Sequence, residues 1–188
     1  MATLSAETSR RRVPLTRPQV QLLVDGGLLL PGTTEYINGE LLEKMPQNPP
    51  HVNATKRTRR TLESIFGWEN VASQAPLRTS DLSDPEPDAF VTRQPTESYT
   101  ETPVAADCVL VVEVSDATLS WDRTEKLKLY ARAGIEEYWI ADVNNRRLIV
   151  HRRPSGEEYL DIRTYTDAEF VAPLARPDAN VPVGDLLP

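Results

Sequence analysis

Glu113 is an acidic residue inside an apolar run, residues 109–115, that is otherwise typical of a strand buried on both faces. Side chains alternate along a strand, so Glu113 shares one face with Val109, Val111 and Ser115. An ionised carboxylate in such a place is costly unless it pairs with a cation or binds a metal ion. The run therefore predicts a partner for Glu113, and the nature of that partner indicates the chemistry.

Lys126 is the candidate partner, because it follows on a segment with the periodicity of a helix that ends at Gly134. When residues are placed at steps of about 100°, Lys126 falls within the apolar arc, close to Tyr130. Lys128 falls on the opposite, solvent-facing arc. The pattern predicts that Lys126 points toward the strand of Glu113. A snorkelling lysine or a structural ion pair remains the alternative.

Asp88 is a second acid, in "PEPDAFV", where a proline-bounded loop enters an apolar strand. Alone it is typical of a turn or cap aspartate. With Glu113 on a neighbouring strand, the two carboxylates could hold one divalent ion, Mg²⁺ or Mn²⁺. Lys126 would then position the attacking water and stabilise the developing charge. Two acids and one lysine are thus the constituents of a metal-assisted phosphodiester hydrolysis site.

Basic residues form a stripe on the helix expected after the Pro49-Pro50 break, opposite an apolar arc that includes Leu62. The stripe consists of Lys56, Arg57, Arg59 and Arg60. It could lie along a phosphate backbone and bind nucleic acid. The alternative interpretation is the ordinary solvated face of a helix.

The remaining pattern predicts how these residues are positioned. Residues 1–15 are basic and without periodicity, and we expect a flexible arm; residues 16–188 are expected to form one domain. A short helix follows Thr16, and Asn38-Gly39 is the turn chemistry of a hairpin. Strands alternating with two longer helices then give an α/β or α+β core.

Composition and the absence of certain motifs argue against several other classes of protein. The 188 residues carry a formal net charge of −7, which argues against coating nucleic acid by bulk electrostatics and is compatible with a carboxylate-rich metal site. The sequence contains neither a segment of about 20 apolar residues nor a secretory signal, so we expect a cytoplasmic protein without a membrane span. A single cysteine, Cys108, cannot form an internal disulfide. The sequence contains no glycine-rich phosphate loop, zinc motif or nucleophile elbow.

The segments "PDAF" and "LVVEVSDATLSWDRTEKLKLYARAGIEEYWIADV" resemble the Uma family of predicted bacterial restriction endonucleases, a branch of the PD-(D/E)XK nuclease superfamily. The resemblance extends from about Val20 to the C-terminus. It implies a restriction-endonuclease-like core: a mixed central β-sheet flanked by helices, with an N-terminal helix and hairpin. In the wider superfamily the lysine follows the strand acid by two positions, where this chain has Ser115. The resemblance implies that the lysine has migrated to the helix, at Lys126.

The family also carries an acidic motif in its first hairpin, which "EYINGELLE" resembles, and this implies Glu40 as an extra carboxylate near the metal. His51 resembles a family position too, although a histidine at a helix N-terminus is more often structural. Asp122 is expected to cap the lysine-bearing helix rather than to orient Lys126.

The sequence thus predicts an Mg²⁺- or Mn²⁺-dependent endonuclease acting on nucleic acid, with DNA as the expected substrate. Asp88 and Glu113 are the predicted metal ligands, Lys126 the catalytic lysine and Glu40 a supporting catalytic residue. A homodimer is expected by analogy only, because such nucleases often pair to cut both strands. The alternative is a catalytically idle nuclease-fold module that binds nucleic acid or a protein partner.

Overall fold

The computed structural model describes residues 12–30 and 32–188. Most of the predicted N-terminal arm, residues 1–11, lies outside the described residues. The main helices and strands are α1 Arg17–Asp25, β1 Thr34–Ile37, β2 Glu40–Glu43, α2 Pro49–Phe66, β3 Val71–Ala72, β4 Ala89–Thr92, β5 Cys108–Ser115, α3 Leu119–Trp121, a π-helical turn Asp122–Lys126, α4 Leu127–Arg132, β6 Glu137–Asp142, β7 Arg147–Ser155, β8 Glu158–Thr166, β9 Phe170–Val171 and β10 Val181–Pro182.

A six-stranded sheet in the order β3-β4-β5-β6-β7-β8 forms the centre of the fold. Strands β5 and β6 are parallel, whereas the other neighbouring pairs are antiparallel. The prediction of a mixed central sheet is therefore confirmed. Strand β5 lies between β4 and β6 and is buried along nearly its whole length, and Glu113 is buried with it.

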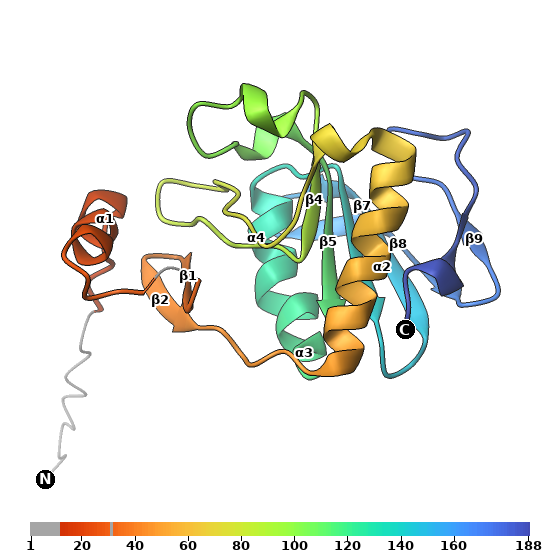
Figure 1. Ribbon diagram of the computed structural model, residues 1–188, viewed down its shortest axis with the longest axis horizontal. Helices are drawn as coiled ribbons and strands as arrows, with labels where there is room; N and C mark the ends of the chain where they lie inside the picture. The colour runs from red at the N-terminus through yellow and green to blue at the C-terminus, as the bar shows by residue number, and fades with distance from the viewer. Residues whose placement is uncertain (1–11, 31) are drawn as a thin grey trace, which may run out of the picture.

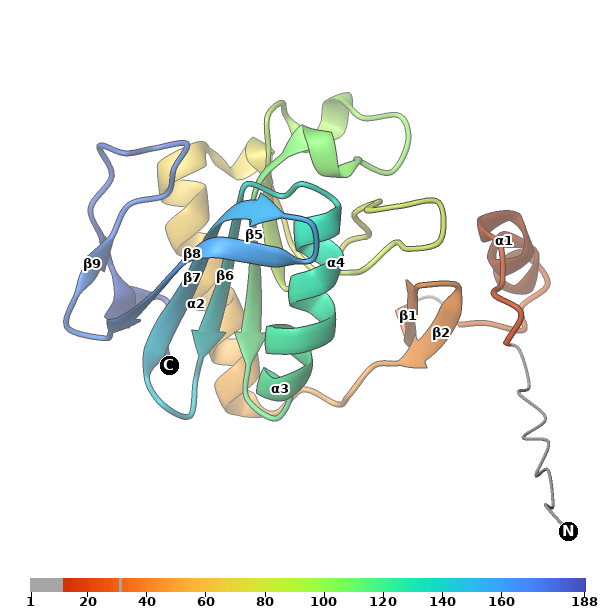
Figure 2. The same ribbon diagram turned by 180° about the vertical axis from the view of Figure 1, so that it is seen from behind.

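Helices α2 and α4 cover opposite faces of the sheet (Figures 1 and 2). Alternation along β5 sends Leu110 and Val112 to the cluster that includes Leu62 of α2. Val111 joins the second cluster, with Tyr130 of α4. Glu113 extends the face of Val111, as strand periodicity predicts, so its side chain points toward the helix that follows β5.

The chain before the sheet forms α1 and the β1–β2 hairpin, which stand to one side of the core (Figures 1 and 2). The hairpin turn is Asn38-Gly39, with φ of 51° and 79°, as the Asn-Gly pair predicts. Leu15 N donates a hydrogen bond to Gly39 O. Across the described ranges, every helix is too short or too polar to span a bilayer.

Candidate active site

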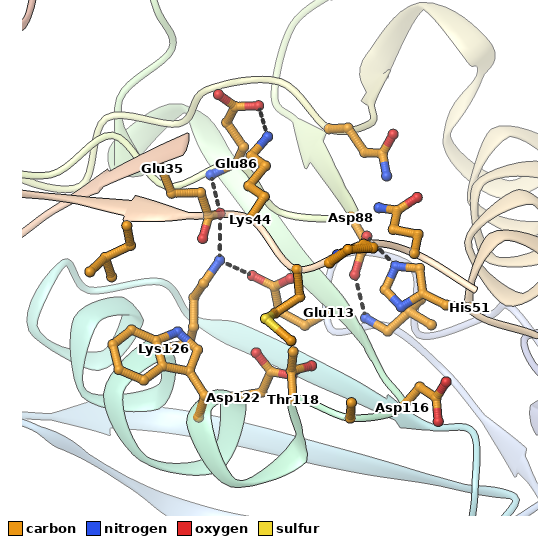
Figure 3. A pocket seen from close by; sticks show the side chains of 18 of the residues that line it. Glu35, Lys44, His51, Glu86, Asp88, Glu113, Asp116, Thr118, Asp122 and Lys126 are labelled. Carbon is orange, nitrogen blue, oxygen red and sulfur yellow. Dashed lines mark hydrogen bonds and ion pairs between the residues drawn. The ribbon is translucent and has the colours of Figure 1, made fainter. Parts of the chain in front are cut away.

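A cavity of about 490 Å³ lies where the hairpin, the N-terminus of α2, the end of β5 and α3 meet. Asp88, Glu113 and Lys126 all line this cavity, although they are far apart in the sequence (Figure 3). The structure thus brings together the two predicted metal ligands and the predicted lysine.

Lys126 and Glu113 form a buried ion pair with 3.0 Å between Nζ and Oε1. The same Oε1 accepts a 2.6 Å hydrogen bond from the Tyr130 hydroxyl. Tyr130 lies four residues after Lys126, so both side chains reach the strand from one side of the helical segment. Lys126 itself ends a π-helical turn, a local feature that recurs at functional sites.

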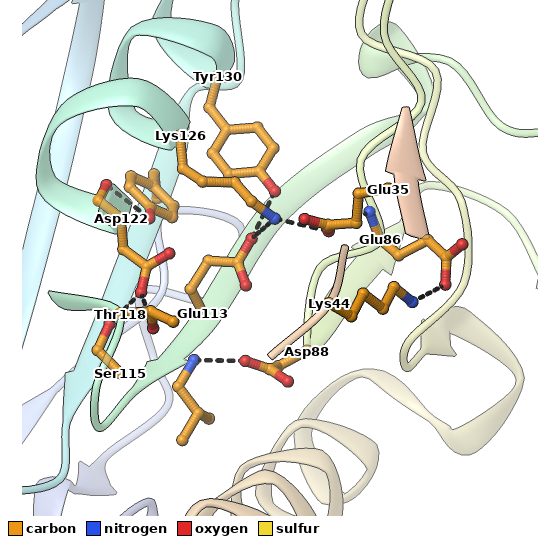
Figure 4. Close-up of polar contacts among 12 residues, drawn as sticks. Glu35, Lys44, Glu86, Asp88, Glu113, Ser115, Thr118, Asp122, Lys126 and Tyr130 are labelled. Carbon is orange, nitrogen blue, oxygen red and sulfur yellow. Dashed lines mark hydrogen bonds and ion pairs between the residues drawn. The ribbon is translucent and has the colours of Figure 1, made fainter. Parts of the chain in front are cut away.

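Glu35 of β1 is a third carboxylate at this position, and it was not predicted from the sequence. Its Oε1 lies 2.8 Å from Lys126 Nζ and also accepts a hydrogen bond from Glu86 N at 2.9 Å. The lysine is therefore held between Glu35 and Glu113 (Figure 4). A further ion pair, between Lys44 and Glu86, connects the end of the hairpin to the loop before β4.

Glu40 does not join this group. It lies next to the hairpin turn, pairs with Arg12, and its side chain is 44% exposed. Glu35 and Glu40 occupy the same face of the hairpin, because their cross-strand partners are Leu42 and Ile37. Glu35 is two positions further from the turn, about 7 Å along the strand, and only it reaches the cavity. The family motif indicated the hairpin, but not which of its acids faces the site.

Asp88 is held by two contacts on its two oxygens. Oδ2 accepts a 2.8 Å hydrogen bond from Val114 N, and Oδ1 lies 3.0 Å from His51 Nε2. Burial lowers the pKa of His51, but the hydrogen bond to Asp88 and the negative charges of Asp88, Asp116 and Asp122 together outweigh burial, and the pKa is raised overall. His51 thus lines the cavity and contacts a predicted metal ligand, Asp88.

Asp122 was expected to cap the lysine-bearing helix, and this prediction is wrong. The residue before the first helical turn is Thr118, and Asp122 lies within the helical segment. Its Oδ2 accepts hydrogen bonds from Ser115 Oγ at 2.5 Å and Thr118 Oγ1 at 2.7 Å. Asp122 instead connects the end of β5 to the helical segment, and it lines the same cavity.

Burial and the neighbouring charges together raise the pKa of both Glu113 and Lys126. Burial raises the pKa of the Glu113 carboxyl, and the positive charge of Lys126 opposes that shift. Burial lowers the pKa of Lys126, but Glu113 and Glu35 outweigh it and the pKa of Lys126 is raised overall. Lys126 is therefore an ammonium ion at neutral pH, suited to stabilising negative charge rather than to accepting a proton.

The donor set fits a divalent cation of the Mg²⁺ type. Glu113 Oε2 has no hydrogen-bond donor among the described residues, whereas Oε1 has two. Mg²⁺ usually takes one or two carboxylates and keeps several waters. Within residues 12–30 and 32–188 no cluster of three or more acidic, histidine or cysteine side chains is arranged to hold a metal. A cation here would use Asp88 and Glu113, with water and substrate oxygens completing its coordination.

The basic stripe of α2 lies outside this cavity. Lys56, Arg57, Arg59 and Arg60 are exposed, and none is among the described residues that line the cavity. Arg59 pairs with Glu63 at 2.7 Å, and Arg57 reaches the carbonyl oxygen of Gly184 at 3.4 Å. The helix does contribute its first turn to the cavity through His51.

Comparisons with known proteins agree with this architecture. The sequence profile of the Uma2 family, described as "Putative restriction endonuclease", matches residues 30–184. The fold is similar to a crystal structure from Anabaena variabilis ATCC 29413, described as "a putative nuclease belonging to DUF820", with a TM-score of 0.63. The two sequences are 16% identical, and the match covers 92% of this chain and 97% of the other. Comparison with proteins of curated function returns no match.

Proposed function

Because the chain belongs to the Uma2 family, we propose that it is an endonuclease that uses Mg²⁺ or Mn²⁺ to hydrolyse phosphodiester bonds of nucleic acid, with DNA as the expected substrate. One observation carries the proposal: the ammonium of Lys126 lies 3.0 Å from Glu113 in a cavity that Asp88 also lines. Two carboxylates and a permanently charged lysine are the groups that this hydrolysis requires.

Asp88 and Glu113 are the residues that would hold the cation. When bound, the cation polarises the phosphodiester and lowers the pKa of a water molecule. The Lys126 ammonium stabilises negative charge that develops on the phosphate oxygens and orients the attacking water. Its raised pKa keeps it charged throughout the neutral range.

Two neighbours position these groups. Tyr130 donates its hydroxyl hydrogen to Glu113 Oε1, which fixes the rotation of that carboxylate. Glu35 holds Lys126 from the opposite side and is itself anchored by the backbone of Glu86. Such preorganisation reduces the rearrangement needed when charge develops in the transition state.

The contacts of Lys126 also favour a second candidate, a catalytically idle module that binds nucleic acid or a protein. A lysine held between Glu35 and Glu113 has the geometry of a structural ion pair. Titration calorimetry with Mg²⁺ and Mn²⁺ separates the two candidates. Binding that is lost in Glu113→Gln supports the nuclease, whereas an absence of binding in the native protein supports the idle module.

Purified protein incubated with supercoiled plasmid, single-stranded DNA and RNA tests the activity directly. Each substrate is incubated separately with Mg²⁺, Mn²⁺ and Ca²⁺, and Glu113→Gln is the negative control. We expect cleavage with Mg²⁺ or Mn²⁺ that the variant lacks. The ratio of nicked to linear plasmid also tests the predicted homodimer, because a paired enzyme cuts both strands.

A further inference from the structure

One wall of the cavity is apolar although the catalytic groups are charged. Trp121, Met45, Pro46 and Leu42 all line it. Trp121 is 38% exposed and Met45 is 67% exposed. A large aromatic side chain left partly in water beside a charged site has unused apolar surface, and such surface commonly marks a place where a ligand binds.

The charged part of the wall is strongly acidic. Its carboxylates are Glu35, Glu43, Glu86, Asp88, Glu113, Asp116 and Asp122. The lysines there are Lys44 and Lys126, and both are paired with acids. Phosphate charge alone would therefore be repelled, so a nucleic acid needs attraction from a bound cation and from contacts to its bases.

Trp121 is placed to supply such a contact. It ends α3 and directly precedes the π-helical turn that carries Lys126. The side chains of Glu113 and Lys126 are only 6% and 5% exposed, so the scissile phosphate must enter the cavity to reach them. A nucleotide that enters brings its base with it, and an aromatic side chain at the wall offers a stacking surface.

We propose that Trp121 stacks on an unpaired base, so that the cavity accepts a nucleotide of a single strand or of a locally opened duplex. The inference rests on the proposed nuclease function and defines its substrate. Met45 and Pro46, from the segment before α2, extend the apolar surface available to that base. The stacking contact is independent of base identity, because every base has a π face.

The chain contains three tryptophans, which makes the stacking directly observable. Trp139 is fully buried, whereas Trp68 is 67% exposed and does not line the cavity. In the background of Trp68→Phe, quenching of fluorescence on addition of oligothymidine with Ca²⁺ reports on Trp121. We expect clear quenching, and we expect Trp68→Phe/Trp121→Phe to lose it.

An oligonucleotide of the same length with abasic sugars supplies the matched ligand control. It keeps the phosphates but has no base to stack, so it should leave the fluorescence unchanged. Thymidine monophosphate is the second control, and it should quench only at far higher concentration than the strand. Equal quenching by the abasic strand would overturn the stacking, and equal quenching by the mononucleotide would indicate a nucleotide-binding pocket instead.

Affinity gives an independent readout. Trp121→Ala should weaken binding of the single strand on the order of tenfold to a hundredfold, the range for losing one base–aromatic stack. Trp121→Phe keeps an aromatic face and should retain most of the affinity. If Trp121→Ala cleaves intact duplex and binds the single strand as tightly as the native protein, this inference is overturned and the nuclease function still stands. A protein that binds no form of nucleic acid would overturn both.

Discussion

Lys126 and Lys128 lie two positions apart on one helical segment, yet their side chains are 5% and 45% exposed. Lys126 is held by the buried carboxylate of Glu113 and the partly buried carboxylate of Glu35, while Lys128 makes a loose 3.5 Å contact with Glu125 at the surface. The same charge thus occurs in two environments within one turn. Substituting each lysine in turn therefore distinguishes a catalytic contribution from a general effect of positive charge.

Lys126→Ala should lower the single-turnover cleavage rate on the order of a hundred- to thousandfold, the cost of losing one charge contact in the transition state. Its affinity for Mg²⁺, measured by calorimetry, should change little because Asp88 and Glu113 remain. Lys128→Ala should leave both quantities unchanged. Equal rate losses in the two variants, or a Lys126→Ala variant that is altered only in its melting temperature, would reject the lysine as a catalytic group.

Glu113→Gln should abolish Mg²⁺ and Mn²⁺ binding in titration calorimetry while preserving the fold. The amide keeps the shape of the side chain but removes the charge that holds the ion. Lys126 retains Glu35 as a partner, so the melting temperature without metal should not fall.

Glu137 provides the matched control for this substitution. It is a fully buried acid of the neighbouring strand β6, paired with Arg152 rather than with a cavity residue. Glu137→Gln should lower the melting temperature, because Arg152 loses its charged partner, and should leave metal binding intact. A Glu113→Gln variant that still binds Mg²⁺ as tightly as the native protein would place the ion elsewhere.

Glu35→Gln and Glu40→Gln separate the two acids of the hairpin. Glu35 contacts Lys126, so its neutral variant should slow cleavage roughly tenfold by loosening a charge-assisted contact, with metal affinity retained. Glu40 pairs with Arg12 at the surface, and its variant should behave as the native protein. Single-turnover rates at saturating Mg²⁺ measure both. A loss at Glu40 with none at Glu35 would restore the assignment made from the family motif.

Local periodicity was sufficient to predict the inward position of Lys126 and of Glu113. Each sits in a regular element whose remaining residues define an apolar face, so a charged residue on that face is conspicuous. The Asn38-Gly39 turn was equally predictable from its own residue types. These features depend on neighbours a few positions away, and for that reason a sequence is enough.

Contacts between distant segments were not accessible in the same way. Glu35 reaches Lys126 across 91 positions, and His51 reaches Asp88 across 37. The cap assigned to Asp122 failed for a different reason: the helical segment begins earlier, after Thr118, so Asp122 lies inside it and accepts a hydrogen bond from Ser115. No pattern within the hairpin distinguishes Glu35 from Glu40, since both occupy one face and only the tertiary placement of the hairpin selects between them.

The basic stripe of Lys56, Arg57, Arg59 and Arg60 should determine affinity rather than chemistry. Each lost phosphate contact should lower the slope of log K against log salt by about 0.9 for duplex DNA. Binding measured at several salt concentrations, for the variant with all four replaced by alanine, tests this. Arg163→Ala, an exposed arginine on β8, is the control. If the slope is unchanged in the variant, the stripe makes no phosphate contacts and is only the solvated face of α2.

His151 predicts how stability depends on pH, independently of the active site. It is buried on β7, where it stacks on Tyr138 with ring centroids 5.3 Å apart. Burial, assisted by the charge of Arg123 and opposed by the Tyr138 carbonyl, lowers the pKa of His151 to about 4 from its ordinary 6.5. The folded protein therefore favours the neutral imidazole.

Between pH 6.5 and 4 the unfolded chain binds this proton and the folded chain does not. The stabilisation is complete above pH 6.5 and is lost as the pH falls toward 4, by about 3 kcal/mol in total. Urea denaturation of the native protein and of His151→Phe, at several values between pH 7.5 and 4.5, measures this contribution. Phenylalanine keeps the ring against Tyr138 but has no proton to gain, so the native protein should lose more stability than the variant over this range. Identical pH dependence in the two proteins would mean that His151 titrates alike in the folded and unfolded states.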